Sequence, residues 1–222
     1  MVSFDILDLT VPHRYGGQRN VLVITNHYST LRKAYLLKSR HQTADALEQF
    51  LNFSKAHGVQ VKWLHRDGAK EFYKSAPNLK EVLKRHGLLG CTSTLAADVH
   101  LQNGVAEHSN WTIQEGVRTR LVQAKLGLSY WWLALTDTIE VDVYIPLKGL
   151  TSEMPYSRFF GTMPSIAHVR SFSCFAYPHL LRDGQDGGAG ASGHIPWMTP
   201  HQSAYRVLEI STGKIITTPH MI

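Results

Sequence analysis

The chain has 222 residues, of which 43% are hydrophobic and 18% are charged, a composition that excludes a wholly disordered protein. Its two cysteines, Cys91 and Cys174, lie too far apart for the paired ligands of a zinc finger and are too few for a disulfide framework. The formal net charge of +6 suits a nucleic acid or another anionic partner, and no apolar run is long enough to cross a membrane.

The first part of the chain predicts a mixed α/β domain. Apolar and β-branched runs at 2–9, 21–25, 34–37 and 59–64 are typical of strands. Between them, residues 43–57 place Leu47, Phe50 and Leu51 at helical spacing, and Gly58 follows where a helix end favours glycine. Strands, a helix and a further strand in this order favour a mixed sheet flanked by helices.

The middle of the chain predicts helices, and its end predicts strands. We expect helices at 79–86, from about 101, and at 129–145, with a short strand between 88 and 95. Short strands are expected at 172–177, 205–208 and 214–218, the last two as a hairpin. We therefore divide the chain into a core at 1–150, a connecting segment at 151–182, a glycine-rich linker or loop at 183–193, and a β-rich remainder at 194–222.

Three carboxylates stand out by their positions. Asp5, or Asp8 three residues later, belongs to the first strand, Asp67 follows the strand at 59–64, and Glu107 lies in the opening turns of the long helix. Acids that converge on one spot repel each other unless cations fill the site, and hard oxygen ligands suit Mg²⁺ or Mn²⁺. Each acid alone is more often a solvated surface group or a helix cap, so spacing by itself does not decide between a metal site and a solvated surface.

An ordered set of motifs resembles the integrases of copia-type retrotransposons. Residues 102–107 read QNGVAE, which matches that family's motif letter for letter. The other matches follow in the family's order: 23–29 (VITNHYS, like DDYS), 35–39 (YLLKS, like YFLKS), 66–72 (RDGAKEF, like SDNGGEF), 154–161 with 164–165 (like TPYE…GKKPS), 168–177 (like HLRVFGCLAYVH) and 205–216 (like YRVYDPETGKII).

The resemblance implies a ribonuclease-H-like integrase core and a small β-barrel after it. It implies that Asp5, Asp67 and Glu107 form a catalytic, metal-binding triad for Mg²⁺ or Mn²⁺, with Asp5 favoured over Asp8. We assign nucleic-acid contacts to Lys70, Asn103, Asn110 and Arg118. The implied activity is metal-dependent phosphodiester transfer in DNA integration. The implied partners are the element's DNA ends and target DNA, with RNA and a second copy of the chain as further candidates and no membrane, and the implied location is the nucleus.

The chain also departs from that family. Gly68, Ala69 and Lys70 replace the family's Asn-Gly-Gly beside the second acid. Residues 108–112, which read HSNWT, lack the two basic residues that the family has after the third acid. These departures leave open an alternative, in which the chain is an inactive nucleic-acid-binding remnant of a decayed or domesticated element. A ribonuclease H, which shares the fold and the metals, is a third hypothesis that QNGVAE argues against.

Overall fold

The computed structural model describes residues 1–65, 78–88, 91–92, 99–146, 153–176, 193–198, 205–209 and 212–218. The side chains of 91–92, 99–107, 175–176, 193–198 and 218 are outside this description. The chain divides into two compact units, one of Met1–Glu115 with Ile139–Pro164, the other of Gly116–Thr138 with Ser165–Ile222. The boundary predicted near residue 150 stays a prediction.

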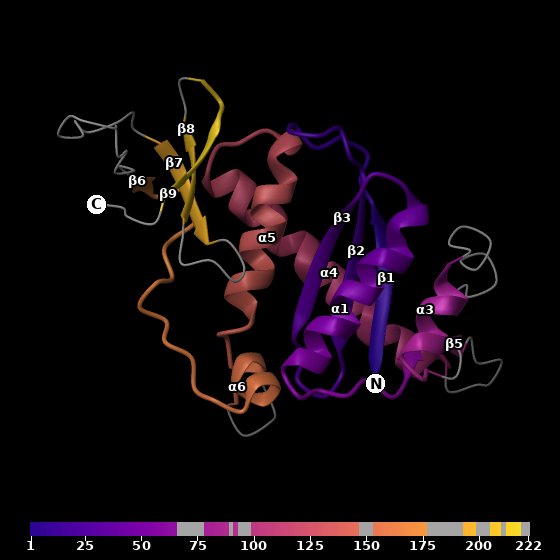
Figure 1. Cartoon of the computed structure of the whole chain (residues 1–222). Coiled ribbons are helices and arrows are strands. Elements are labelled where there is room, and N and C mark those ends of the chain that lie inside the picture. The colour runs from indigo at the N-terminus through magenta and orange to yellow at the C-terminus, as the bar shows by residue number, and fades with distance from the viewer. Residues whose placement is uncertain are drawn as a thin grey trace, which may run out of the picture. The chain divides into compact units, whose positions relative to one another are not determined.

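A five-stranded sheet in the order β3-β2-β1-β4-β5 forms the centre of the first unit (Figure 1). Its strands are β1 (Val2–Asp8), β2 (Asn20–Asn26), β3 (Arg32–Leu37), β4 (Leu64–His65) and β5 (Cys91–Thr92). The first three strands form an antiparallel meander, whereas β4 runs parallel to β1 and β5 runs parallel to β4. The mixed sheet expected from the sequence is therefore confirmed.

The alternation of side chains along β1 gives the sheet two different faces. Val2 and Phe4 are buried in the same hydrophobic cluster as Leu22 and Ile24 of β2. Because successive side chains of a strand point to opposite faces, Ser3 and Asp5 lie on the other face. Asp5 pairs there with Val23 in the antiparallel register of β1 and β2. The position of an acid in β1 thus decides which face it reaches.

Helices α1 (Thr43–Ala56) and α3 (Leu79–Arg85) cover the face that carries Phe4. Leu47 and Phe50 of α1 and Val82 of α3 are almost fully buried in the cluster, since apolar residues recur there at helical spacing. Gly58 follows α1 with a φ of 74°, a conformation that glycine adopts without a steric penalty. This side of the sheet holds the main hydrophobic core of the first unit.

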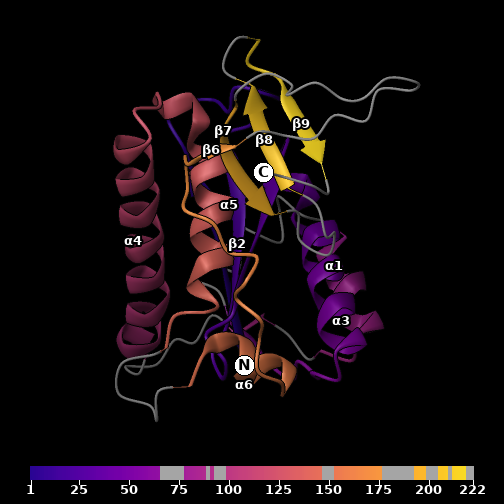
Figure 2. The same ribbon diagram turned by 90° about the vertical axis from the view of Figure 1, so that its left-hand side faces the viewer.

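The opposite face receives helix α4 (Val99–Gln123), whose first part belongs to the same unit. Figure 2 shows α1 and α3 on one side of the sheet and α4 on the other. Ile113 of α4 is fully buried. The end of α5 (Trp131–Asp142) is joined to the edge strand β3 by the ion pair of Arg32 with Asp142 at 2.9 Å. Burial lowers the pKa of Arg32, and Asp142 opposes that shift.

The second unit contains a four-stranded antiparallel sheet in the order β6-β7-β8-β9. The strands are β6 (Phe175–Ala176), β7 (Gly193–Met198), β8 (Tyr205–Glu209) and β9 (Ile215–Thr218). Gly213, with a φ of 66°, lies in the turn between β8 and β9, so the predicted hairpin is confirmed. Over the described residues this sheet is open, with β6 and β9 at its edges.

Several elements differ in extent from the sequence expectation. The strand expected at 59–64 is shorter in the structure: β4 begins at Leu64, and residues 59–63 lead into it outside the strand, with the oxygen of Trp63 accepting the N–H of Val2 in β1 at 2.9 Å. The helix expected at 129–145 begins with a short 3₁₀ turn, η2 (Leu128–Tyr130), and ends at Asp142. β7 was not among the predicted strands, and the glycine-rich segment 183–192 lies outside the described residues. Within the described part of the chain, none of the helices has the length and apolar character that crossing a membrane requires.

Candidate active site

Asp5 and Asp8, the two alternatives for the first acid, point to opposite faces of the sheet. They are three residues apart in β1, an odd number, so strand geometry separates their side chains. Asp8 is half exposed at the end of the strand and forms an ion pair with Arg40 of η1 (Arg40–Gln42). Asp5 lies on the face covered by α4. Of these two acids, therefore, only Asp5 lies on the face of the sheet that is covered by α4, the helix that carries Glu107.

Asn110 of α4 holds the Asp5 carboxylate. The amide of Asn110 donates a hydrogen bond from Nδ2 to Oδ2 of Asp5, with the two atoms 2.7 Å apart. The other oxygen, Oδ1, accepts the backbone N–H of Ile6 at 2.8 Å. Hydrogen bonds to both oxygens fix the orientation of a half-buried carboxylate. Asn110, which the sequence assigned to nucleic acid, is thus a direct partner of the first acid.

Glu107 and Asn103 lie on the same helix as Asn110. A helix turns by about 100° per residue, so positions three and seven residues apart share a face. By this periodicity Asn103 and Glu107 belong to the flank of α4 from which Asn110 reaches Asp5. The side chains of both residues are outside the description, so their roles stay predictions.

Asp67 and Lys70 lie outside the described residues. In the sequence, Asp67 is two positions after His65, the last residue of β4. Asp5 is likewise two positions after Ser3 in β1. Ser3 and His65 are partners in the parallel register of β1 and β4.

Arg118 is exposed on α4 in the second compact unit, and its assignment to nucleic acid also stays a prediction.

The donor chemistry of Asp5 fits the expected divalent cation. A carboxylate has about four lone-pair positions, and two hydrogen bonds leave positions free for a ligand bond. Hard oxygen donors are what Mg²⁺ and Mn²⁺ prefer. Among the described side chains no group of three or more His, Cys, Asp or Glu gathers that could hold a metal ion. The described part of the site therefore supplies one suitable donor, and the other two acids of the predicted triad lie outside it.

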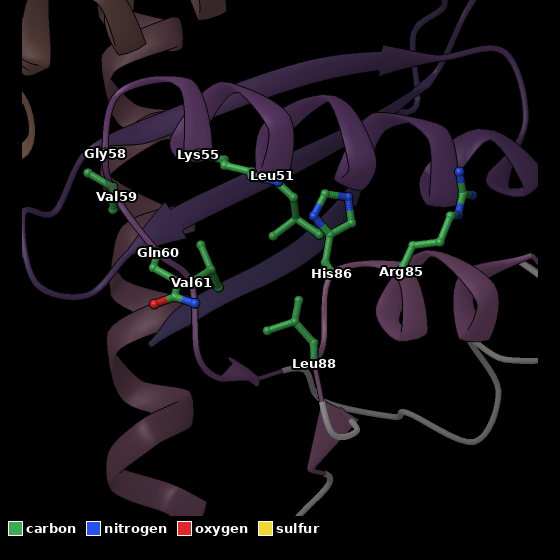
Figure 3. Close-up of a pocket in the computed structure, with 9 residues that line it drawn as sticks. All are labelled: Leu51, Lys55, Gly58, Val59, Gln60, Val61, Arg85, His86 and Leu88. Carbon is green, nitrogen blue, oxygen red and sulfur yellow. The ribbon is translucent and has the colours of Figure 1, made fainter.

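A separate hollow of about 340 Å³ lies between α1, residues 58–61 and the end of α3 (Figure 3). Leu51, Val61 and Leu88 line it together with Lys55 and Arg85. Arg85 is paired with Glu48 of α1 at 2.7 Å. None of the predicted site residues whose side chains are described, Asp5, Asn110 and Arg118, lines this hollow, so we do not assign it to the candidate active site.

Asn110 was assigned to nucleic acid from the sequence, an assignment that stays a prediction, and its contact with Asp5 was not identified. Two signals pointed to its contact with Asp5. Asn110 lies three residues after Glu107, so helical spacing puts both on one face. An amide is also a good donor to a carboxylate in a partly buried site. The distance of 105 residues along the chain hides the contact until the fold is known.

Comparison with known proteins places two plant Pol polyproteins among the relatives of this chain. The retrovirus-related Pol polyprotein from transposon RE2 of Arabidopsis thaliana is 26% identical over 206 residues, which cover 91% of this chain and 14% of that protein. The retrovirus-related Pol polyprotein from transposon TNT 1-94 of Nicotiana tabacum is 27% identical over 169 residues, which cover 76% of this chain and 12% of that protein. The chain thus spans about one seventh of the length of these curated relatives, and no protein-family model matches it.

Among solved structures, the chain is similar to the catalytic core domain of BIV integrase. The TM-score is 0.50 at 15% sequence identity, and the match covers 72% of this chain and 93% of the other. At this identity the likeness concerns the fold. It supports the ribonuclease-H-like architecture that the sequence implied, with a mixed sheet flanked by helices.

Proposed function

We propose that this chain, a divergent homologue of the Pol polyproteins of copia-type plant transposons with the fold of an integrase catalytic core, transfers phosphodiester bonds in DNA. One observation carries the proposal. The first predicted acid, Asp5, faces α4 and is bonded by Asn110, one helical turn beyond Glu107. The helix position of Glu107 is one turn from the residue that bonds Asp5, which supports a site shared by these two acids.

In the proposed reaction, a DNA 3′-hydroxyl or a water molecule attacks a phosphorus atom in line. A new P–O bond forms and the opposite P–O bond breaks, so the number of phosphodiester bonds is unchanged when the attacking group is DNA. Asp5, Asp67 and Glu107 are the residues that would hold the metal. A pair of bound Mg²⁺ or Mn²⁺ ions would neutralise the charge on the attacking and leaving oxygens. Asn110 orients Asp5, so that little rearrangement is needed when substrate binds.

The proposal extends to partners and location. The DNA would comprise the ends of the element and a chromosomal target, which requires access to the nucleus. Lys70, Asn103, Asn110 and Arg118 are proposed contacts to nucleic acid. RNA and a second copy of the chain remain candidates, since integrase-type homology suggests nucleic-acid binding and assembly in general.

The second candidate function is an inactive nucleic-acid-binding remnant. Lys70 stands three residues after Asp67, where its ammonium group would replace a metal ion if it reached the acids. Trp111 and His108 follow Glu107 and supply no permanent charge. This candidate predicts that Mn²⁺ leaves the thermal stability of the chain unchanged. Active phosphodiester transfer predicts a rise in stability with Mn²⁺, because a ligand that binds only the folded state stabilises it.

The direct test is turnover of a pre-branched DNA substrate with Mn²⁺. This substrate presents the junction already assembled, so it demands the least from any further domains. We expect the wild-type protein to cleave and rejoin the strands and Asp67→Asn to be inactive while folded. Turnover by Asp67→Asn at the wild-type rate would refute the triad, and no turnover by folded wild-type protein would favour the remnant.

A further inference from the structure

Trp111 exposes a large aromatic surface on the helix of the candidate site. Its side chain is 61% exposed, although an indole ring buries more apolar area than most other side chains when it packs. Ile113, two residues later on α4, is fully buried. Trp111 is therefore on the solvent side of α4, and its ring is available to a ligand.

The position of Trp111 on α4 is next to the acids. It is four positions after Glu107, so the two positions are about 40° apart around the helix axis and one turn apart along it. Asn110, the residue that bonds Asp5, immediately precedes it. The exposed indole therefore belongs to the rim of the candidate site.

His108 adds a second ring to this surface. The ring centroids of His108 and Trp111 are 6.0 Å apart, and the planes are tilted by 53°. The hydroxyl group of Thr112 donates a hydrogen bond to the backbone oxygen of His108 at 2.8 Å. The oxygen of this hydroxyl group, Oγ1, also lies 3.2 Å from Nδ1 of the His108 ring. Thr112 thus holds the imidazole beside the indole.

We propose that Trp111, with His108 beside it, stacks on an unpaired base of the DNA next to the reacting phosphodiester. This proposal rests on the proposed function for the position of the DNA. Indole rings stack on the face of any base, and bases inside a duplex have no free face to offer. Frayed ends and single-stranded flaps are therefore the preferred substrates. Neither ring needs to carry a charge, so the stacking contact adds little to the salt dependence of binding.

The test compares Trp111→Ala and Trp111→Phe with the control Trp63→Ala. Trp63 is a matched residue, since its side chain is 59% exposed and it precedes β4 outside the α4 helix. Binding of a labelled single-stranded oligodeoxynucleotide and of a blunt duplex of equal length is measured by fluorescence anisotropy. Circular dichroism checks that each variant is folded.

We expect Trp111→Ala to weaken single-strand binding at least about fivefold, the lower end of what one stacked base contributes. Trp111→Phe keeps most of the affinity, because a phenyl ring still stacks. The affinity of Trp111→Ala for the duplex changes less than about twofold, because a duplex offers no unpaired base to stack on. Trp63→Ala binds both DNAs as the wild-type protein does, because Trp63 does not contact the stacked base. Quenching of tryptophan fluorescence by the single strand is reduced in Trp111→Phe.

Three results would overturn the proposal. They are an unchanged single-strand affinity in folded Trp111→Ala, an equal loss for single strand and duplex, and the absence of DNA binding by the wild-type protein. The last result also removes the proposed function. If Trp111→Ala selectively loses single-strand binding but the wild-type protein shows no turnover, the stacking proposal is supported and only the catalytic proposal is overturned. Failure of the stacking proposal and failure of the proposed function are therefore distinguishable.

Discussion

Asn110 Nδ2 lies 2.7 Å from Oδ2 of Asp5, and this contact joins the long helix α4 to the central strand β1. The two residues are 105 positions apart in the sequence. A carboxylate whose two oxygens are both hydrogen-bonded has a defined orientation, which a metal site requires of its ligands. The same contact also stabilises the packing of the helix on the sheet.

Replacing Asn110 by alanine tests both roles. We expect a loss of about 1–2 kcal/mol in the free energy of unfolding, because the lost hydrogen bond is to a charged group in a partly buried place. Activity on pre-branched DNA should fall by about tenfold to a hundredfold, as is typical when the partner of a metal ligand is removed. Urea denaturation and the turnover assay measure the two effects.

The control for this prediction is Asn52→Ala, which truncates an exposed asparagine on α1. Its effects on stability and turnover should be within experimental error, because exposed side chains away from a site contribute little. Wild-type turnover by folded Asn110→Ala would show that Asp5 does not need its amide partner.

Gly116 allows close packing within the second compact unit. A Cβ atom at this position would lie 2.6 Å from Cγ2 of Thr138, which is itself almost fully buried. We therefore expect Gly116→Ala to cost about 1–3 kcal/mol in the free energy of unfolding, as overpacking does. Adding Thr138→Ser, which removes the clashing methyl group, should restore part of the loss in thermal denaturation. Gly127→Ala is the control, since no atom lies within 4 Å of a Cβ placed there.

The ion pair of Arg120 and Asp137 is mostly buried, with a distance of 2.6 Å between Nε and Oδ2. Asp137→Ala leaves the guanidinium of Arg120 without its carboxylate, and we expect a destabilisation of about 3–5 kcal/mol. The exposed pair of Asp8 and Arg40 is the comparison, and Asp8→Ala should cost less than about 1 kcal/mol. Equal losses in urea denaturation would contradict this ranking.

His13 gives the folded protein a pH dependence. Its ring is buried and Nδ1 accepts the backbone N–H of Tyr15 at 3.1 Å, so the neutral form fits the turn. Burial lowers the pKa of His13 below its ordinary value of 6.5. The unfolded chain therefore binds the proton more readily, and stability falls as the pH drops below about 6.5.

The substitution His13→Asn tests this pH dependence. A side-chain oxygen of asparagine accepts the same N–H in such turns, while no group titrates. Thermal denaturation between pH 7.5 and pH 5 should show a smaller loss of stability in the variant than in the wild-type protein. A larger or equal loss in the variant would contradict the role given to His13.

Much of the fold follows from local patterns. The β-branched run in β2 and the spacing of Leu47, Phe50 and Leu51 in α1 predicted their elements, since both patterns are confined to a few residues. The length of β4 was overestimated because residues 59–63 have strand-like composition, whereas the paired strand begins only at Leu64, after one backbone bond from Val2 of β1 to the oxygen of Trp63. Strand partners depend on distant segments, which composition does not reveal.

The candidate site was predictable in part. The resemblance favoured Asp5, and the alternation of side chains in β1 separates it from Asp8 once Asp5 is known to face α4. The contact of Asn110 with Asp5 depends on how α4 lies across the sheet, which no local pattern specifies. The stacking surface of Trp111 was likewise hidden, since exposure is a property of the fold.

The most direct test of the central claim compares Asp5→Asn with Asp8→Asn in Mn²⁺-dependent turnover of pre-branched DNA. The two variants change the same residue type in the same strand, on opposite faces of the sheet. We predict wild-type turnover for Asp8→Asn and none for folded Asp5→Asn. Turnover by Asp5→Asn, or its loss only in Asp8→Asn, would contradict the proposal that the α4-facing side of β1 carries the active site.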